Sequence, residues 1–315
     1  MSIFYNHLQT QNGSEMKVFL TGATGYVGNQ ILQDLLEAKH TVKALVRKGS
    51  QSKLPVNPEQ LEIVQGDALD KSSYQGSLSD CDAVINLIGI IREFPKQGIN
   101  FERMHVRTTQ FLVETALTEG VNRYVQMSAL GVSHDSDSKY FTTKARAEDM
   151  IRASGLNHTI IRPSLIFGPG DEFINYFADI IRKFHTIPVI GHGKYRMEPV
   201  FIKDVSQVFV QSLDKPETIN QTFEMGGPER FDYEEMMHIV KKALGTWAIT
   251  IHYPKSLMMT LAGMLQYYKF FPLTTDQIIQ LFEENITDDD SVYQVYDIQP
   301  TPFEETINGY LNKET

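Results

Sequence analysis

Short apolar segments alternate with amphipathic segments along the first half of the chain. After the first apolar run, Val27, Ile31 and Leu35 recur at helical spacing, so one face of a helix would lie against a sheet. Strands are predicted for six short runs rich in apolar and β-branched residues, at Lys17–Leu20, Thr41–Val46, Leu61–Gln65, Ala83–Leu87, Arg123–Met127 and Thr159–Arg162. A long helix is predicted over 101–119. Strands that alternate with helices in this way predict an α/β fold built on a doubly wound parallel sheet.

After Pro163 the alternation breaks into shorter and more mixed pieces. Helices are predicted over 173–184 and 232–244, a short strand that turns into a helix over 200–205, and a strand over 222–225. We therefore expect a smaller C-terminal lobe folded over the edge of the sheet, where a substrate would lie. The expected organisation is a flexible N-terminal extension, a large sheet domain, and a smaller substrate lobe with tail, some segments of which return to the sheet domain, over residues 1–15, 16–168 and 169–315.

The composition and charge exclude several classes of function. The formal net charge is −10, from 29 lysines and arginines against 39 acidic residues, which argues against nucleic acid because phosphate binding needs a basic face. Cys81 is the only cysteine, so disulfides within the chain are excluded and a reducing cytoplasm fits. No apolar run approaches the ~20 residues that span a bilayer. Residues 1–15 lack the pattern of a signal peptide.

Three glycines at GxxGxxG spacing follow the first predicted strand and open the first predicted helix. Glycines there allow a tight turn, a close approach of backbone to a phosphate, and close packing of helix on strand. The N–H groups at the helix N-terminus then favour an anion such as a pyrophosphate. A glycine-rich turn without a ligand is the alternative. The turn residues predicted to bind a dinucleotide are Gly22, Thr24, Gly25, Tyr26, Val27 and Gly28.

Arg47 and Lys48 follow the second predicted strand, about where NAD-binding units carry an acidic residue that holds the ribose 2′-hydroxyl. Cations at this position suit the 2′-phosphate of NADP. NADP(H) is therefore favoured and NAD(H) is the second choice, while a solvated basic loop is the alternative interpretation.

The carboxyl ends of the other predicted strands meet at the same edge of the sheet, where ligands bind in such folds. Asp67 could accept a hydrogen bond from the adenine amino group, or it could equally cap a helix. The residues at this edge that we predict to contact the cofactor are Asp67, Ala68, Ile88, Gly89, Met127, Pro163 and Leu165.

Tyr140 and Lys144 stand four residues apart on a predicted helix over 140–154, so the phenol and the ammonium share one face. A tyrosine with a pKa near ~10 is a poor acid–base catalyst at neutral pH. A lysine beside it favours the phenolate and could also hold ribose hydroxyls. Both residues are therefore predicted to bind the cofactor as well as to act in catalysis.

Several of these motifs, in this order, resemble the short-chain dehydrogenase/reductase superfamily, in particular its atypical, extended type. The closest subgroup is the NAD(P)-binding proteins similar to the 39-kilodalton accessory subunit of respiratory complex I. The resemblance implies that residues 16–168 form an NAD(P)-binding Rossmann domain. The motifs that carry it are Thr21-Gly-Ala-Thr-Gly-Tyr-Val-Gly28, Gly66-Asp67, Asn86-Leu-Ile-Gly89, Ser128-Ala-Leu-Gly131, Tyr140-xxx-Lys144, Arg162-Pro-Ser-Leu-Ile-Phe-Gly168, Pro199-Val-Phe-Ile-Lys-Asp204 and Leu273-Thr-Thr-Asp-Gln277.

The resemblance also implies catalytic roles. Tyr140 would be the general acid–base, Lys144 would orient the nicotinamide ribose, and Ser128 would help to bind a substrate carbonyl. The register leaves open whether Ser128 or Ala129 occupies the position of the family's serine. If it is Ala129, the hydrogen-bond donor is missing and full activity is doubtful. His105 replaces an asparagine found in many extended members, and we assign it no role.

Two hypotheses follow. The first is an NAD(P)-dependent oxidoreductase or epimerase that acts on an unidentified carbonyl or hydroxyl substrate, with a nucleotide sugar among the candidates. The second is an NADP(H)-binding assembly or sensor protein with little or no turnover, similar to the complex I subunit. The apolar stretch 257–271 is predicted to be an amphipathic helix that docks on the lobe itself, on a partner such as a respiratory complex, or on a membrane. We expect a cytoplasmic protein, with a place at the membrane periphery as the alternative; the oligomeric state stays open.

Overall fold

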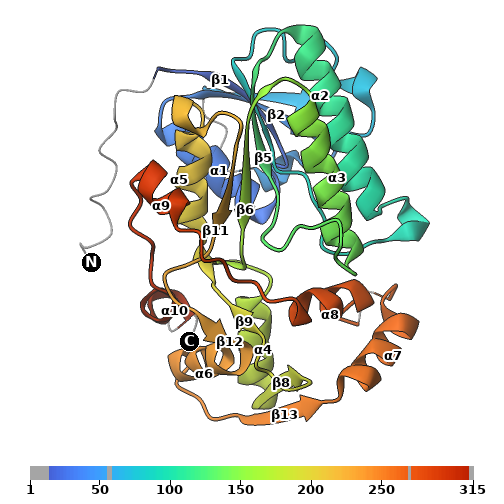
Figure 1. Ribbon diagram of the computed structural model, residues 1–315, viewed down its shortest axis with the longest axis vertical. Helices are drawn as coiled ribbons and strands as arrows, with labels where there is room; N and C mark the ends of the chain where they lie inside the picture. The colour runs from blue at the N-terminus through green and yellow to red at the C-terminus, as the bar shows by residue number, and fades with distance from the viewer. Residues whose placement is uncertain (1–13, 55–58, 269–270, 312–315) are drawn as a thin grey trace.

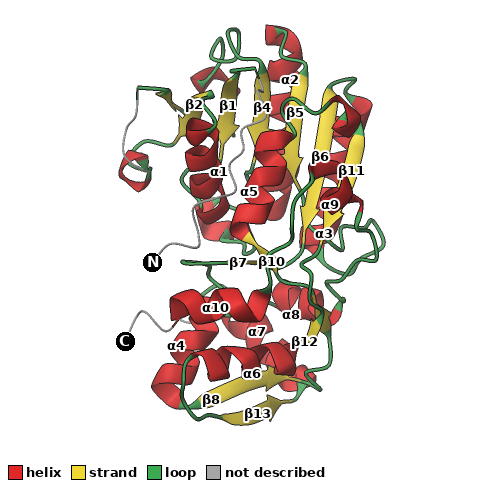
Figure 2. Ribbon diagram, turned by 90° about the vertical axis from the view of Figure 1, so that its left-hand side faces the viewer, coloured by secondary structure: helices red, strands yellow, loops and turns green. Residues whose placement is uncertain are grey.

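The computed structural model describes residues 14–54, 59–268 and 271–311. At its centre is a seven-stranded sheet in the order β11-β6-β5-β4-β1-β2-β3, in which all neighbours are parallel (Figures 1 and 2). The predicted doubly wound parallel fold is therefore confirmed. The strands are β1 Lys17–Thr21, β2 Thr41–Val46, β3 Leu61–Gln65, β4 Ala83–Asn86, β5 Arg123–Met127, β6 Asn157–Pro163 and β11 Gln221–Met225.

Helices cover both faces of this sheet (Figure 1). Along β1, Val18 and Leu20 pack in one core and Phe19 in another, because successive side chains of a strand point to opposite faces. The first core includes side chains of α1 Tyr26–Glu37, α5 Ile202–Gln211 and α9 Ser291–Tyr296. The second includes side chains of α2 Thr108–Glu119 and α3 Lys139–Ala153. The carboxyl edge of the sheet therefore lies between two helical layers.

Two predicted elements differ in the structure. The strand predicted over 222–225 belongs to the central sheet, not to the lobe, because β11 pairs with β6 from Gln221 to Met225. The long helix expected over 101–119 begins with a π-helical segment, Glu102–Arg107, before α2. Such wider turns occur often at functional sites, and this one carries the buried side chain of His105.

The small lobe, which lies below the central sheet in Figure 2, has its own hydrophobic core. Ile181, Met236 and Phe303 are fully buried there, from three different helices. The chain returns to the large domain through α5, β11 and α9, so the segment 169–315 is shared between the two. The lobe elements are α4 Ile174–Phe184, β8 Thr186–Ile190, β9 Arg196–Met197, β12 Phe231–Asp232, α6 Tyr233–Ala243, β13 Ile249–Tyr253, α7 Lys255–Leu265, α8 Thr275–Phe282 and α10 Phe303–Leu311.

Short elements complete the fold. The two-residue strands β7 Ile166–Phe167 and β10 Val200–Phe201 pair in parallel where the chain passes between the domain and the lobe. Within the described ranges, no helix is both long and apolar enough to cross a membrane. The 3-10 helices are Gln51–Lys53, Lys71–Ser73, Pro95–Gln97 and Pro216–Thr218. Residues 1–13 of the predicted N-terminal extension lie outside the described residues.

Candidate cofactor-binding site

The glycine turn connects β1 to α1 with very close backbone packing. Gly22 has φ +80°, and the Gly25 N–H donates to the Gly22 carbonyl oxygen at 3.0 Å. A Cβ atom added at Gly28 would lie 2.1 Å from that same carbonyl oxygen. Because no side chain tolerates this distance, the first turn of α1 approaches the strand only with glycine at this position.

The N-terminus of α1 presents unpaired donors to the sheet edge. Its N-cap is Gly25, which makes no side-chain capping bond, and its first turn carries no acidic residue. The first N–H groups of a helix have no partner within the helix and carry a partial positive charge. The turn therefore fits a pyrophosphate, which would supply the missing acceptors.

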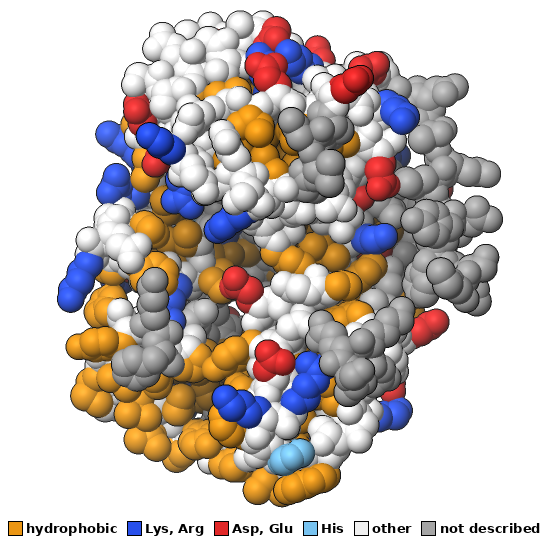
Figure 3. Space-filling model, turned by 180° about the vertical axis from the view of Figure 1, so that it is seen from behind, with side chains coloured by type: hydrophobic (Ala, Val, Ile, Leu, Met, Phe, Trp, Pro, Cys, Tyr) orange, Lys and Arg blue, Asp and Glu red, His pale blue; other side chains and the backbone are white. Residues whose placement is uncertain are grey.

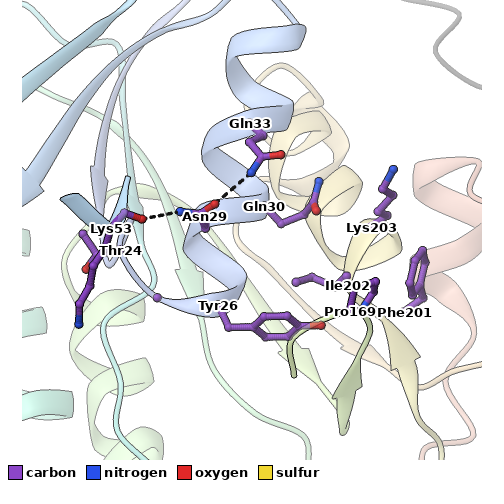
Figure 4. Close-up of a pocket in the computed structure, with 11 residues that line it drawn as sticks. Thr24, Tyr26, Asn29, Gln30, Gln33, Lys53, Pro169, Phe201, Ile202 and Lys203 are labelled. Atoms are coloured by element: carbon purple, nitrogen blue, oxygen red, sulfur yellow. Dashed lines mark hydrogen bonds between the residues drawn. The ribbon is translucent and has the colours of Figure 1, made fainter. Parts of the chain in front are cut away.

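A groove borders this turn and extends toward the small lobe (Figure 4). Thr24, Gly25 and Tyr26 line it on one side, and Lys53 also lies along it. The Asn29 amide donates to the Lys53 carbonyl oxygen at 3.1 Å, which ties the loop after β2 to α1. The Tyr26 ring extends toward Ile202, and its buried hydroxyl has no hydrogen-bond partner among the described residues.

The next two strands place further predicted residues at the same edge. Arg47 and Lys48 follow β2 and are exposed, and within the described part of the chain their side chains form no ion pair. The Asp67 carboxylate accepts from the Leu69 N–H at 2.9 Å, whereas Asp70 caps the following 3-10 helix. Asp67 therefore does not cap the helix, and its carboxylate stabilises only the local turn to Leu69. Ala68 beside it is buried.

A buried polar network fixes the turn after β4, and sequence reasoning assigned it no role. The Asn86 amide group accepts from Thr21 at 2.7 Å, donates to Gln126 at 2.9 Å, and accepts from the Ile88 N–H at 3.2 Å. Three neighbouring strands are therefore tied together where Ile88 and Gly89 leave the sheet. The sequence feature that could have indicated this network is Asn86 itself, a polar residue at the end of an otherwise apolar strand.

Tyr140, Lys144, His105 and Gly89 converge at this edge. The Lys144 Nζ lies 5.3 Å from the centre of the Tyr140 ring and donates to the Met127 carbonyl oxygen at 3.3 Å. A Cβ atom added at Gly89 would lie 3.6 Å from Lys144 Nζ and 3.7 Å from His105 Nε2. The predicted face shared by Tyr140 and Lys144 is therefore present, next to the ends of β4 and β5.

Burial sets the ionisation of this group. The pKa of Lys144 falls to about 8 because its ammonium is removed from water. The pKa of Tyr140 is raised by burial and by the nearby Asp276 carboxylate. The expectation that Lys144 would favour the phenolate is therefore not met in this structure, since burial and Asp276 both raise the pKa of the phenol.

His105 has a structural environment that the sequence did not indicate. It is buried, with Nδ1 2.9 Å from the Thr143 hydroxyl and Nε2 3.2 Å from the backbone of Ile90. Burial and the charge of Lys144 hold its pKa well below the ordinary value, so the ring is neutral. It joins the π-helical segment to α3 and to the loop after β4.

Ser128 and Ala129 face different surroundings at the end of β5. The buried Ser128 hydroxyl donates to Glu148 Oε1 at 2.5 Å, one helical turn beyond Lys144 on α3. Ala129 packs with Tyr140 and Phe141 in a small apolar cluster. The hydroxyl of Ser128 is thus engaged by Glu148, whereas the Ala129 side chain offers no hydrogen-bond donor.

The remaining predicted contacts lie at the ends of β5 and β6. Met127 ends β5 and Pro163 ends β6, where the Pro163 carbonyl oxygen accepts from the Leu130 N–H. The Leu165 N–H donates to the Asn285 side chain at 2.9 Å. The C-terminal segment therefore helps to shape the edge at which these residues lie.

Comparison with known proteins agrees with this geometry. A family model described as NAD(P)H-binding matches residues 22–172. The mouse protein named NADH dehydrogenase [ubiquinone] 1 alpha subcomplex subunit 9, mitochondrial, is 31% identical over 303 residues, which cover 90% of this chain and 76% of the relative. The NAD(P)H azoreductase of Xenophilus azovorans is 24% identical over 245 residues, covering 76% and 80%.

The fold has solved counterparts as well. The UDP-glucose 4-epimerase of Thermotoga maritima, solved with UDP-glucose, superposes with a TM-score of 0.75 at 16% identity, covering 95% of this chain and 99% of the epimerase. These likenesses agree with the NAD(P)-binding edge described above. The chain belongs to the family of the NADH dehydrogenase [ubiquinone] 1 alpha subcomplex subunit 9 proteins.

Proposed function

We propose that this protein binds NADP(H) at the carboxyl edge of its central sheet and holds it with little or no turnover, as an accessory component of a respiratory assembly. One observation carries the proposal: the Ser128 hydroxyl donates to the buried Glu148 carboxylate, and the next residue, Ala129, packs in an apolar cluster and has no side-chain donor to replace it. The mouse relative, named as a subunit of the NADH dehydrogenase alpha subcomplex, supports the assembly role.

The chemistry of hydride transfer explains why this observation matters. Reduction of a carbonyl builds negative charge on its oxygen, and a hydroxyl donor close to that oxygen lowers the barrier. Loss of one such donor typically costs about 10²–10³ in rate. The raised pKa of Tyr140 also moves the phenol further from the neutral pH at which acid–base catalysts work best. Both features favour cofactor retention over turnover.

The cofactor preference rests on Arg47 and Lys48. Both side chains are exposed after β2, at the position where a carboxylate would favour NAD. Two cations there would attract the 2′-phosphate of NADP. They would give the protein, which is acidic as a whole, a local positive charge at the position of that phosphate. We therefore propose NADP(H) ahead of NAD(H).

Binding and turnover are measured on the same preparation. Titration with NADPH and NADH, followed by nicotinamide fluorescence, should give tighter binding of NADPH, and Arg47→Ala with Lys48→Ala should remove the difference. NADPH oxidation with a panel of aldehydes, ketones and quinones should stay at the background rate. Carbonyl-dependent oxidation that Tyr140→Phe abolishes would overturn the proposal of low turnover, and equal affinities would overturn the preference.

A second candidate is an NAD(P)H-dependent reductase of an unidentified carbonyl or nucleotide-sugar substrate. The convergence of Tyr140, Lys144 and Gly89 favours it, and one relative is named as an NAD(P)H-dependent reductase, although of azo compounds. The variant Ala129→Ser separates the two candidates, because it adds a hydroxyl beside Tyr140. If only this missing donor prevents catalysis, the variant gains a carbonyl-dependent rate that Tyr140→Phe removes.

We further propose that the protein is cytoplasmic and meets its assembly, or a membrane beside it, through the C-terminal tail. The lone cysteine, Cys81, is buried and its pKa is raised to about 12 by burial, so it is an inert thiol suited to a reducing compartment. Fractionation of cells expressing the tagged chain tests the location.

A further inference from the structure

Exposed hydrophobic side chains gather at one end of the small lobe. Figure 3 shows the hydrophobic side chains crowded over the lower part of the molecule. Among the described residues, seven of the eleven large hydrophobic side chains that are exposed fall between positions 247 and 268. We call these seven the lobe-end surface: Trp247, Ile249, Tyr253, Leu257, Met264, Tyr267 and Tyr268.

Helix α7 carries large apolar side chains on its outer as well as its inner face, alongside the exposed Lys255, Ser256 and Thr260. Met258, Met259 and Ala262 face inward, where they pack with Ile278 of α8. Outward, Leu257 and Met264 are 48% and 60% exposed. A helix on the surface of a globular protein normally carries polar residues on its outer face. The outer face of α7 therefore lacks the surroundings that would bury it.

The charge around the lobe-end surface is opposite to that of the whole chain. From residue 236 to residue 275 there are four lysines and no aspartate or glutamate, so these 40 residues carry a formal charge of +4 in a chain of net charge −10. Lys242 is paired with Glu304, whereas Lys255 lies over the Phe282 ring at the start of α7. The segment that carries the apolar surface thus contributes cations and no carboxylate of its own, while the Glu234 carboxylate lies 3.7 Å from the His252 ring at its border.

We propose that the lobe-end surface docks on a lipid bilayer that contains anionic phospholipid, with α7 lying in the plane of the interface. Leu257 and Met264 would enter the acyl boundary, the tyrosines and Trp247 would lie at the headgroup level, and the lysines would attract the anionic headgroups. Docking goes beyond the proposed cofactor function, because it uses no residue of the dinucleotide edge.

The same features argue against a second copy of the chain on this surface. A two-fold contact would set one cationic segment against another, with no carboxylate between 236 and 275 to pair with the lysines. Protein interfaces are also depleted in lysine and enriched in arginine, and this segment contains lysine and no arginine. A bilayer satisfies both the apolar stripe and the charge.

Vesicle co-sedimentation tests the proposal on the full chain. Vesicles of phosphatidylcholine with a minority of phosphatidylglycerol should bind the protein, pure phosphatidylcholine should bind it far more weakly, and added salt should release it. The double variant Leu257→Glu with Met264→Glu should lower the partition coefficient by at least about tenfold, since two side chains leave the acyl boundary. Leu117→Glu is the matched control, because Leu117 on α2 is 49% exposed but lies in the large domain.

Each outcome decides the matter. NADPH titration of every variant shows whether that variant is folded and still binds the cofactor. A failure of docking is therefore distinguished from a failure of cofactor binding. Equal binding to neutral vesicles, or equal loss in Leu117→Glu, contradicts the proposal. A wild-type protein that does not bind the anionic vesicles also contradicts the proposal. If that protein is a dimer that the double variant dissociates, the surface belongs to a second copy of the chain. If it is a monomer, the surface is left for a protein partner.

Discussion

Glu148 is a buried carboxylate around which donors from three elements gather. Arg162 of β6 and Arg152 of the same helix bind its Oε2, and Ser128 binds its Oε1. Burial alone would raise the pKa of Glu148, but these donors, Arg162 foremost, hold it below the ordinary value. Ser128 therefore belongs to a structural cluster, and its neighbour Ala129 packs against the same apolar cluster as Tyr140.

Removal of the Ser128 hydroxyl tests this assignment. Ser128→Ala deletes one donor to a buried charge, so the free energy of unfolding should fall by about 1.5–3 kcal/mol, while NADPH affinity stays unchanged. Urea denaturation and nicotinamide fluorescence give the two quantities. Unchanged stability together with weaker binding of a carbonyl ligand would instead place the hydroxyl in the cleft.

The low pKa of Lys144 makes stability depend on pH. Its pKa is about 8 in the folded protein, against 10.5 for an ordinary lysine, so the unfolded chain binds the proton more tightly. Burial of Lys144 therefore destabilises the protein fully below pH 8, and this penalty disappears as the pH rises to about 10.5.

Lys144→Met should consequently stabilise the protein at pH 7, by up to about 3 kcal/mol before the lost bond to Met127 is counted, and by little at pH 10.5. Thermal melts over this pH range measure the difference. NADPH affinity should fall in the same variant, because the ribose loses a cation. A gain in stability that does not vary with pH would mean that another group causes it.

At the scale of elements, the glycine turn couples packing to cofactor binding. Gly28→Ala puts a methyl group 2.1 Å from the Gly22 carbonyl oxygen, which forces α1 away from β1 and moves its N–H groups off the phosphate position. Circular-dichroism melts and NADPH titration should show lower stability and at least about tenfold weaker binding. Gly309→Ala on α10 is the control, since a Cβ there meets nothing within 4 Å, and it should stabilise slightly.

Helix α8 holds the start of the helix that carries Tyr140. Asp276 accepts from the Ser138 hydroxyl at 2.9 Å and from the Lys139 N–H at 2.7 Å, across 137 residues of sequence. Arg92 adds a second tie, because its guanidinium donates to backbone carbonyls of Gln266, Tyr268 and Phe271. The cofactor edge is thus joined on two sides to the α7–α8 segment.

Asp276→Ala should loosen the first turn of α3. Loss of a capping carboxylate typically costs about 0.5–2 kcal/mol, so urea denaturation should show that decrease and hydrogen exchange should quicken in the first turn of α3. Asp290→Ala is the comparison, because Asp290 precedes α9 without making a side-chain capping bond. Equal effects of the two changes would mean that a general loss of negative charge is responsible.

The sequence was most informative where a feature depends on local pattern. The strands, the glycine turn and the Tyr140–Lys144 face follow from apolar periodicity and fixed spacing. The orientation of Ser128 could not be predicted, since a shift by one residue at a strand end exchanges the two sides of the sheet. The tie from Asp276 to Lys139 could not be predicted either, because one sequence contains no record of contacts between distant segments.

At the scale of the whole molecule, the chain alternates between the large sheet domain and the small lobe. After Gly168 the chain enters the lobe, returns as α5 and β11, enters the lobe again and returns as α9. Val205, Val208 and Phe209 of α5 and Phe223 of β11 are buried in the large core. The predicted boundary at 168 therefore divides the sequence at a point where the core of the sheet is incomplete.

A chain that ends at Gly168 should therefore fail to fold into a stable dinucleotide-binding domain. It lacks β11 beside β6 and the α5 side chains against α1; each buried apolar side chain is worth about 1.5–3 kcal/mol, so four of them approach the entire stability of a typical domain. The truncated chain should bind a hydrophobic dye, melt without cooperativity and bind no NADPH, whereas the full chain should melt in one transition that NADPH raises. A cooperative melt of the truncated chain would show that the first 168 residues fold on their own, and that α5 and β11 only cover a finished core.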